Sequence, residues 1–397
     1  MGEFLQLKSP TQAHQILAAF TALDRERVAL ADAAGRVLGE DLVAPEDSPP
    51  WSRSVMDGYA VRAQDTFGAS DTVPVFLKVK GTVPMGSEWA GVLGPGEAVG
   101  ISTGGVLPEG ADAVVMVEYT QRGTGCEIEV ARAVATGDNV IRRGEDLAEG
   151  ALMLRCGQRL RAQDVGVLSS FGIVGVSVYR QPVVGILSTG TELVPTDATP
   201  RRGQIRCMNQ LTLAAQVSKA GGIPVRAGIV ADDMDAITER TSELVERCDV
   251  VLLSGGSSIG VRDLTGQVLE RLGAETLFHG ISVRPGKPTV VARKNQKPIL
   301  GMPGVPVSAM VIFDVFVRPL LWRLEGENER EPWPARRAAR MTRQLASVPG
   351  REDYVRARLV QRDDGAWAEP LMGGSAMTST LLFADGRVCI PQNSEGV

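Results

Sequence analysis

Residues 250–263 read VVLLSGGSSIGVRD, an apolar run that passes directly into a loop of glycines and serines and ends on an aspartate. A short β-branched run of this kind is typical of a strand buried on both faces, since a helix needs a longer stretch. Similar runs occur at 183–187, 223–230 and 298–301. Amphipathic stretches separate them, so residues 181–326 are predicted to form a doubly wound α/β domain with a mostly parallel sheet. Its helices are expected near 209–220, 234–246, 264–272 and 307–324.

The rest of the chain divides into three further predicted domains. Residues 1–44 and 144–180 mix helical and strand patterns and are expected to form one discontinuous α/β scaffold domain, with a second helix near 28–38. Between them, residues 45–143 consist of short alternating runs punctuated by glycine and proline, which predicts an inserted mainly β domain. In residues 327–397, the charged, proline-containing stretch NEREPWPARR follows Glu327, and alternating runs come after it. This pattern predicts a linker and a small C-terminal β-barrel domain.

The composition argues against several classes of protein. A net charge of -5 argues against a nucleic-acid binder, because duplex binding relies on a basic surface. The two histidines, His14 and His279, make a histidine-based triad or metal site improbable. The five cysteines are scattered without a CxxC pair, so neither a zinc site nor a disulfide framework is expected. No apolar run approaches the roughly 20 residues of a membrane span, so we expect no membrane partner and a cytoplasmic location.

Each predicted strand of the sheet is followed by a loop rich in glycine, hydroxyl or carboxyl groups. In an open α/β sheet, ligands bind outside the carboxyl ends of the strands, so these loops are expected to form the walls of one pocket. Glycines beside hydroxyls allow backbone N–H groups to point at an anion such as phosphate or molybdate. One such loop alone is more often a tight turn, but four together favour a binding site. The candidates after the third run are Ser254, Gly255, Gly256 and Ser258.

The same predicted rim carries the carboxylates Glu192, Asp232 and Asp263. Carboxylates beside an anionic ligand repel it unless a hard cation such as Mg²⁺ lies between them, so these three are candidate metal ligands. Arg284 and Lys287 are the candidate partners for the negative charge of the ligand. The structural alternatives are a helix cap for Asp263 and a surface turn for the segment with the two basic residues.

Three motifs lie outside the predicted sheet domain, and each taken alone is a turn. They are SVMDGYAV at 54–61, STGGVLPEGADAVV at 102–115 and RRGED at 142–146. Together with STGTEL at 188–193, the SGG…D loop, RPGKP at 284–288 and GMPGVPVSA at 301–309, they follow the order found in the molybdopterin molybdotransferases, the MoeA family. The chain resembles this family from about residue 48 to residue 326 and weakly beyond. The family also includes the cofactor-synthesis domain of gephyrin.

The resemblance implies a four-domain protomer whose sheet domain binds molybdopterin, in a homodimer with the site between two protomers. It implies Mg²⁺-dependent insertion of molybdate into adenylyl-molybdopterin with release of AMP. A molybdopterin adenylyltransferase and molybdoenzyme acceptors or chaperones are the implied partners. The implied catalytic residues are Asp57, Thr103, Asp146, Glu192, Asp232 and Asp263, of which Asp57 and Thr103 would face the sheet pocket of the partner. The implied cofactor pocket adds Pro303, Gly304, Pro306, Arg351 and Ser375 to Arg284 and Lys287.

The sequence departs from the family pattern at a few positions. Val305 stands where the family usually has asparagine, and Gly280 where it often has lysine. The segment RCMN at 206–209 replaces a more acidic version, and the family pattern would place a further strand after Val397. Since no carboxylate is lost, we expect the activity to be retained, with an altered substrate range or a weakened rate as the alternative.

Three other functions stay open on the sequence. A molybdopterin adenylyltransferase shares the sheet and the SGG…D loop, but it lacks the three other predicted domains. A paralogue kept as a binding or scaffold module is mildly favoured by Val305 and Gly280 and opposed by the complete acid set. A nucleotide amidohydrolase that uses the same sheet domain is the most remote alternative.

Overall fold

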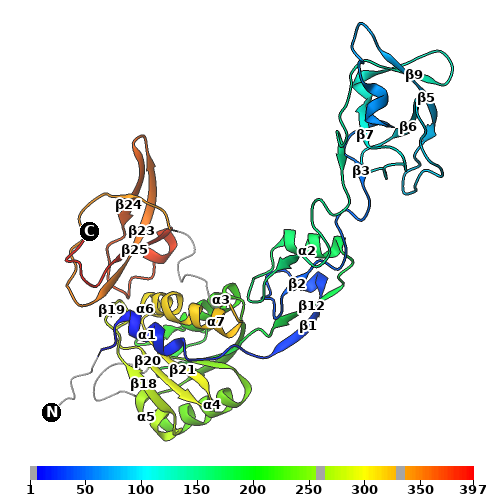
Figure 1. The fold of residues 1–397 in the computed structure, drawn as a ribbon. Coiled ribbons are helices and arrows are strands. Elements are labelled where there is room, and N and C mark those ends of the chain that lie inside the picture. Colours follow the sequence, from blue (N-terminus) through cyan, green and yellow to red (C-terminus); the bar gives the residue numbers. More distant parts are fainter. Residues whose placement is uncertain (1–6, 256–263, 328–335) are drawn as a thin grey trace. The chain divides into compact units, whose positions relative to one another are not determined.

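The computed structural model describes residues 7–255, 264–327 and 336–397 (Figure 1). The chain forms two compact units, and each is described by itself. The first unit comprises Met1–Glu40, Cys156–Gly166 and Val174–Val397, and the second comprises Asp41–Arg155 and Val167–Ile173. The four domains with boundaries at 44/45, 143/144, 180/181 and 326/327 stay a proposal.

A six-stranded sheet forms the centre of the first unit. Its strand order is β16-β13-β17-β21-β20-β18, with the first four strands parallel and the last two antiparallel. The doubly wound, mostly parallel sheet is thereby confirmed, with an antiparallel pair at one edge that the sequence patterns did not predict. The bounds are β13 (Val183–Thr189), β16 (Ile223–Val230), β17 (Val250–Ser254), β18 (Glu275–His279), β20 (Val290–Lys294) and β21 (Lys297–Met302).

Helices cover both faces of this sheet, as Figure 1 shows. Alternate residues of β17 belong to different cores: Val250 and Leu252 pack with α3, α6 and α7, whereas Val251 and Leu253 pack with α4 and α5. This two-sided burial explains why the strand is apolar throughout instead of alternating. The helices are α3 (Asn209–Ala220), α4 (Met234–Arg247), α5 (Leu264–Arg271), α6 (Pro306–Ile312) and α7 (Arg318–Leu324), and the π-helical turn η4 (Phe313–Val317) joins the last two.

The amino-terminal part of the first unit contains one helix and a strand. Helix α1 (Pro10–Leu17) begins with a capping box in which Ser9 and Gln12 exchange hydrogen bonds. The second helix expected near 28–38 is wrong: that region contains β1 (Arg25–Ala29) and the 3-10 turn η1 (Leu30–Asp32). Strand β1 pairs antiparallel with β12 (Gly175–Tyr179). A partner strand 150 residues away in sequence therefore overrides the local pattern.

The carboxyl-terminal part of the first unit is a five-stranded sheet in the order β19-β23-β24-β22, with β25 on β23. One member, β19, comes from the sheet domain and pairs in parallel with β23. Most of the predicted linker, residues 328–335, lies outside the described residues. The elements are β19 (Val283–Arg284), β22 (Arg340–Met341), β23 (Glu352–Arg362), β24 (Gly365–Pro370), α8 (Thr380–Phe383) and β25 (Gly386–Ile390).

The second unit is mainly β, as expected for the inserted segment. Its sheet has the order β7-β4-β6-β5-β9-β8, and two short pairs, β3–β10 and β2–β11, accompany it. A Cβ atom on Gly58 would lie 1.9 Å from the carbonyl oxygen of Val115, so only glycine fits this position of the MDGYAV motif. The bounds are β2 (Leu42–Val43), β3 (Arg53–Ser54), β4 (Gly58–Val61), β5 (Val75–Thr82), β6 (Glu97–Ile101), β7 (Ala113–Met116), β8 (Thr120–Arg122), β9 (Glu127–Val130), β10 (Val140–Ile141) and β11 (Leu152–Leu154).

Candidate active site

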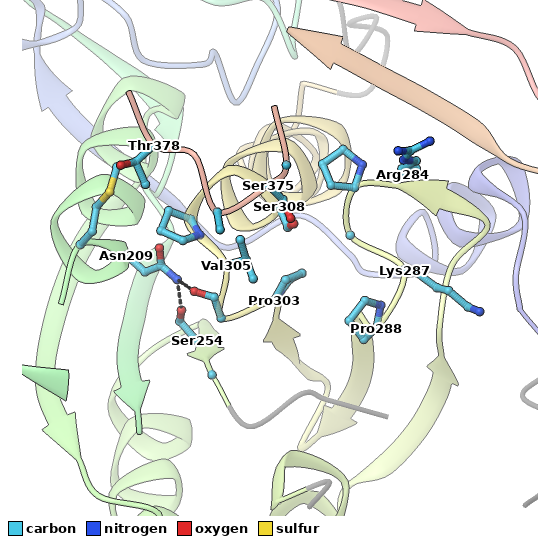
Figure 2. A pocket seen from close by; sticks show the side chains of 18 of the residues that line it. Asn209, Ser254, Arg284, Lys287, Pro288, Pro303, Val305, Ser308, Ser375 and Thr378 are labelled. Atoms are coloured by element: carbon cyan, nitrogen blue, oxygen red, sulfur yellow. Dashed lines mark hydrogen bonds between the residues drawn. The ribbon is translucent and has the colours of Figure 1, made fainter. Parts of the chain in front are cut away.

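A cavity of about 2150 Å³ opens at the carboxyl edge of the parallel strands (Figure 2). The sheet supplies one wall through the ends of β13, β17 and β21. The C-terminal part supplies another through residues 350, 351 and 353–356 and through residues 371–376 and 378 of the loop after β24. The predicted residues that line it are Glu192, Asp232, Ser254, Gly255, Arg284, Lys287, Pro303, Gly304, Pro306, Arg351 and Ser375. The other three predicted for this pocket, Gly256, Ser258 and Asp263, lie outside the described residues.

The floor of the cavity is held together by Asn209, the first residue of α3. Its Nδ2 donates hydrogen bonds to Ser254 Oγ at 2.7 Å and to the carbonyl oxygen of Gly304 at 2.8 Å (Figure 2). Ser254 ends β17, and Gly304 lies in the proline loop after β21. One buried amide thus ties a helix start to two strand ends, which fixes the relative positions of these loops.

The proline loop leads directly into α6. Pro303 is buried, whereas Gly304 and Val305 are exposed to the cavity. Val305 is the N-cap residue of α6, with φ -74° and ψ 122°, and its side chain makes no capping hydrogen bond. Because an apolar N-cap leaves helix N–H groups without a side-chain acceptor, valine is a poor residue at this position.

The acidic rim consists of Glu192 and Asp232, both exposed. Thr191 connects the two loops: the backbone N–H of Asp232 donates to Thr191 Oγ1 at 3.2 Å. Gly190 has φ +152°, and a Cβ there would lie 2.7 Å from Glu192 Oε2, so glycine allows the carboxylate to fold back over the turn. Among the described residues, no group of three or more His, Cys, Asp or Glu side chains is placed to hold a metal ion.

The cationic wall consists of Arg284, Lys287 and Arg351, and its two arginines lie beside the buried carboxylate of Asp353. Arg351 donates to Asp353 twice, from Nε at 2.8 Å and from Nη2 at 3.3 Å. Arg284 is exposed, and its Nη1 lies 3.8 Å from Asp353 Oδ2. Lys287 is exposed and has no ion-pair partner within the described ranges. The ammonium of Lys287 and most of the Arg284 guanidinium are therefore available to an anion.

Another arginine in the lining, Arg356, is buried, with 7% of its surface exposed. Its Nη2 donates to the carbonyl oxygen of Gly373 at 3.2 Å, while its Nε is buried without a hydrogen-bond partner among the described residues. Burial lowers the pKa of this guanidinium from its ordinary value. The carbonyl of Gly373 belongs to the loop that carries Ser375, so Arg356 anchors that loop and adds positive charge behind it.

Gly280, one of the positions that depart from the family pattern, has a backbone that lysine would not adopt easily. Its φ is +96°, in the left-handed region, and a Cβ would lie 2.6 Å from Leu7 Cδ2. Its carbonyl oxygen accepts a hydrogen bond from the N–H of Lys8 at 3.1 Å. Glycine at this position therefore belongs to a turn that packs closely against the amino-terminal segment.

The three remaining predicted catalytic residues lie in the second unit. Asp57 Oδ1 accepts hydrogen bonds from the backbone N–H of Thr103 at 2.7 Å and from its hydroxyl at 3.1 Å. These two bonds, the backbone one first, hold the pKa of the Asp57 carboxyl below its ordinary value. Asp146 Oδ2 accepts from Ser48 Oγ at 3.3 Å. The structure therefore brings Asp57 and Thr103 together and places Asp146 in a separate turn contact.

Three family descriptions match the chain in sequence order. They are "MoeA N-terminal region (domain I and II)" over residues 8–172, "Probable molybdopterin binding domain" over 185–323 and "MoeA C-terminal region (domain IV)" over 338–397. The chain belongs to the MoeA family. The second match covers the sheet whose carboxyl edge forms the cavity.

Relatives of this MoeA-family chain are similar along most of its length. The molybdopterin molybdenumtransferase of Bacillus subtilis (strain 168) is 35% identical, covering 94% of this chain and 87% of the relative. The molybdopterin molybdenumtransferase of Nostoc sp. is 36% identical, covering 90% of this chain and 82% of the relative. A solved structure of the molybdopterin biosynthesis MoeA protein from Pyrococcus horikoshii OT3 superposes with a TM-score of 0.86 at 34% identity, over 99% of this chain and 97% of that one. The chain is thus a member of a transferase family of molybdenum cofactor biosynthesis.

Two residues that line this pocket of the MoeA-family chain, Asn209 and Arg356, were not among the site residues predicted from the sequence. Asn209 starts a predicted helix, where asparagine usually indicates a cap. Arg356 alternates with Tyr354 on the buried face of β23, and a charge on such a face is the signal that indicates a site. Within the described residues, no helix is long and apolar enough to cross a membrane.

Proposed function

We propose that this protein inserts molybdate into adenylyl-molybdopterin and releases AMP, as a cytoplasmic step of molybdenum cofactor synthesis. The observation that carries the proposal is the joining of a cationic wall and a carboxylate rim in one large cavity. In this reaction two Mo–S bonds form with the dithiolene, and one molybdate oxygen leaves as water with the two thiol protons. A water molecule adds to the phosphoanhydride, so the bond to AMP breaks and molybdopterin keeps its own phosphate.

The side chains of the cavity suit a reaction between two anions. Arg284, Lys287 and Arg351 bind and orient the oxyanion and the pyrophosphate, since guanidinium and ammonium groups form charge-assisted hydrogen bonds with such oxygens. Molybdate is itself electrophilic, so the protein supplies positioning and charge stabilisation without a covalent nucleophile. Glu192 and Asp232 line the same cavity and are acceptors for a cation or for ligand protons.

Mg²⁺ fits these side chains. The ion usually takes one or two carboxylates from a protein and completes its six ligands with water and substrate phosphate. Glu192 and Asp232 are two exposed carboxylates in one lining, and they would hold it together with Asp263. When bound, Mg²⁺ would neutralise charge on the pyrophosphate. The chain's own part is to join the loop of Asp232 to the loop of Glu192, through the hydrogen bond that the backbone N–H of Asp232 donates to Thr191 Oγ1.

The experiment is a reconstitution with purified protein, adenylyl-molybdopterin, Mg²⁺ and molybdate, in which AMP release is followed. Asp232→Asn is expected to reduce molybdate-dependent AMP release by at least tenfold. The matched control is Asp235→Asn, because Asp235 is an exposed aspartate three positions away that pairs with Arg271 and does not line the cavity. A wild-type protein that binds the ligand but releases no AMP would favour the scaffold function instead.

We infer further that the enzyme works as a homodimer in which the partner's Asp57 and the partner's Thr103 complete each sheet pocket. The cavity lining comes from the first unit, whereas these two residues lie in the second, and a shared site would join them across protomers. The substrate then comes from a molybdopterin adenylyltransferase, and the product passes to molybdoenzyme acceptors or chaperones.

A mixed dimer tests the shared site. One protomer carries Asp57→Asn and the other carries Asp232→Asn, and the purified heterodimer is compared with both mutant homodimers. If the site joins two protomers, the heterodimer contains one intact site and recovers about half of the wild-type activity, while both homodimers stay inactive. A heterodimer as inactive as the homodimers would place Asp57 and Asp232 in the same protomer's site.

A further inference from the structure

The amide of Asn209 has a fixed orientation in the floor of the cavity. Its NH₂ group has two hydrogens, and both are used: one on Ser254 Oγ at 2.7 Å and one on the carbonyl oxygen of Gly304 at 2.8 Å. Figure 2 shows the amide nitrogen turned toward these two acceptors. In a flipped amide, Asn209 Oδ1 would face the carbonyl oxygen of Gly304, and two acceptors would meet without a hydrogen between them. The amide therefore keeps its nitrogen toward Gly304 and Ser254, and Oδ1 points away from them.

That oxygen, Asn209 Oδ1, is buried and accepts no hydrogen bond from the residues that the structure describes. Buried polar atoms without a partner are rare in folded proteins, because each forfeits its hydration without compensation. Asn209 itself has 7% of its surface exposed and lines the cavity. An acceptor of fixed direction is therefore present in the floor of the pocket, under the proline loop.

A second buried atom without a partner lies beside it. Ser188 Oγ has none among the described residues, and Ser188 is the register partner of Ser254 on the neighbouring parallel strand. Ser188 has no exposed surface as a residue, yet it contributes to the cavity lining. These two polar groups, one at the start of α3 and restricted to accepting and one near the end of β13, make the floor chemically different from the cationic wall.

We propose that Asn209 Oδ1 accepts a hydrogen bond from an N–H group on the heterocycle of the ligand and so sets the direction in which the ligand lies. A fully deprotonated oxyanion such as molybdate has no donor to offer Oδ1, so molybdate binds at Arg284 and Lys287 instead. The heterocycle lies under the proline loop, with its amino edge toward α3. This inference rests on the proposed function for the identity of the ligand.

Adenylyl-molybdopterin has two heterocycles with amino groups, pterin and adenine, and the experiment distinguishes them. Binding is measured by calorimetry for two pairs of probes. The first pair is AMP and purine riboside 5′-monophosphate, which lacks the 6-amino group. The second is pterin-6-carboxylate and the same pteridinone without its 2-amino group. In the wild type, loss of the amino group is expected to weaken binding about 5- to 10-fold in one pair, as for one buried hydrogen bond.

Two variants separate recognition of the ligand from support of the loops. In Asn209→Ala both members of the discriminating pair are expected to bind equally. Ser254→Ala removes one anchor of the amide but keeps Oδ1, so it is expected to retain most of the discrimination. Discrimination that survives in Asn209→Ala, or that Ser254→Ala abolishes as fully, would overturn the proposal. Thermal melts of both variants verify that they are folded.

AMP release distinguishes this inference from the proposed function. If molybdate-dependent AMP release is intact but in neither probe pair does the difference in affinity depend on Asn209, only the inference on ligand direction fails. If a probe pair depends on Asn209 but no AMP is released with molybdate, the pocket recognises the heterocycle and the transferase function fails.

Discussion

Arg284 and Asp353 are register partners in the parallel pairing of β19 with β23, and Arg284 Nη1 lies 3.8 Å from Asp353 Oδ2. The two residues come from different parts of the chain, the sheet domain and the C-terminal sheet. Asp353 is buried and also receives two hydrogen bonds from Arg351. This buried carboxylate therefore gathers two cations at the wall of the cavity, one held firmly and one loosely.

The two arginines are predicted to differ in what their removal does. Arg284→Met is expected to raise the KM for the anionic substrate about tenfold but to change the free energy of unfolding by less than ~0.5 kcal/mol, because an exposed, long ion pair contributes little. Arg351→Met is expected to reduce activity and also to cost about 1–3 kcal/mol, since the buried Asp353 loses two donors. Steady-state kinetics and urea unfolding check both. Equal stability losses in the two variants would contradict this assignment.

Asp57 is predicted to titrate below its ordinary pKa. Because the folded pKa is lowered by the Thr103 hydrogen bonds, the contact stabilises the turn above the unfolded value of about 3.9 and is lost as pH falls through the folded value. An NMR titration of the carboxyl carbon is expected to give a midpoint below 3.9 in the wild type. In Thr103→Ala the midpoint of Asp57 should rise only part of the way toward the ordinary value, since the backbone N–H of residue 103 still donates to the carboxylate. A wild-type midpoint at or above 3.9 speaks against these bonds.

Val305→Asn is predicted to stabilise the protein. Val305 has the extended backbone of an N-cap but no side-chain acceptor, and asparagine supplies one for the first turn of α6. The expected gain is about 1 kcal/mol in the free energy of unfolding. Val305→Ala is the control, because it shortens the side chain without adding an acceptor. Denaturant unfolding that finds the two variants equally stable would show that the cap is not formed.

Arg356→Met is predicted to have opposite effects on stability and on ligand binding. Replacing a buried, poorly paired guanidinium by an apolar side chain of similar length is expected to raise the free energy of unfolding by about 1 kcal/mol. The same change removes positive charge behind the Ser375 loop, so the Kd for an anionic ligand such as AMP should rise several-fold. Urea unfolding and calorimetry measure the two effects. A variant that loses stability would show that the Gly373 contact outweighs the burial of charge.

Sequence patterns predicted the parallel part of the sheet well and the β1 region badly. The runs at 183–187, 223–230, 250–253 and 298–301 correspond to β13, β16, β17 and β21, because burial on both faces leaves a continuous apolar signal. The strand β1 shows no such signal, since three of its five residues are charged and it is stabilised by pairing with β12.

The sequence by itself determined the family, the strand ends, and the acidic and basic residues that follow those ends. Each of these features is a run of adjacent residues, so it can be recognised without knowing the fold. Only the tertiary structure decided which groups share a wall. Strand pairing brings Arg284 to Asp353, which also binds Arg351. Asn209 binds both Ser254, 45 residues away in sequence, and Gly304, 95 residues away. Such contacts leave no local pattern, since the direction of a buried amide depends on partners that only folding brings together.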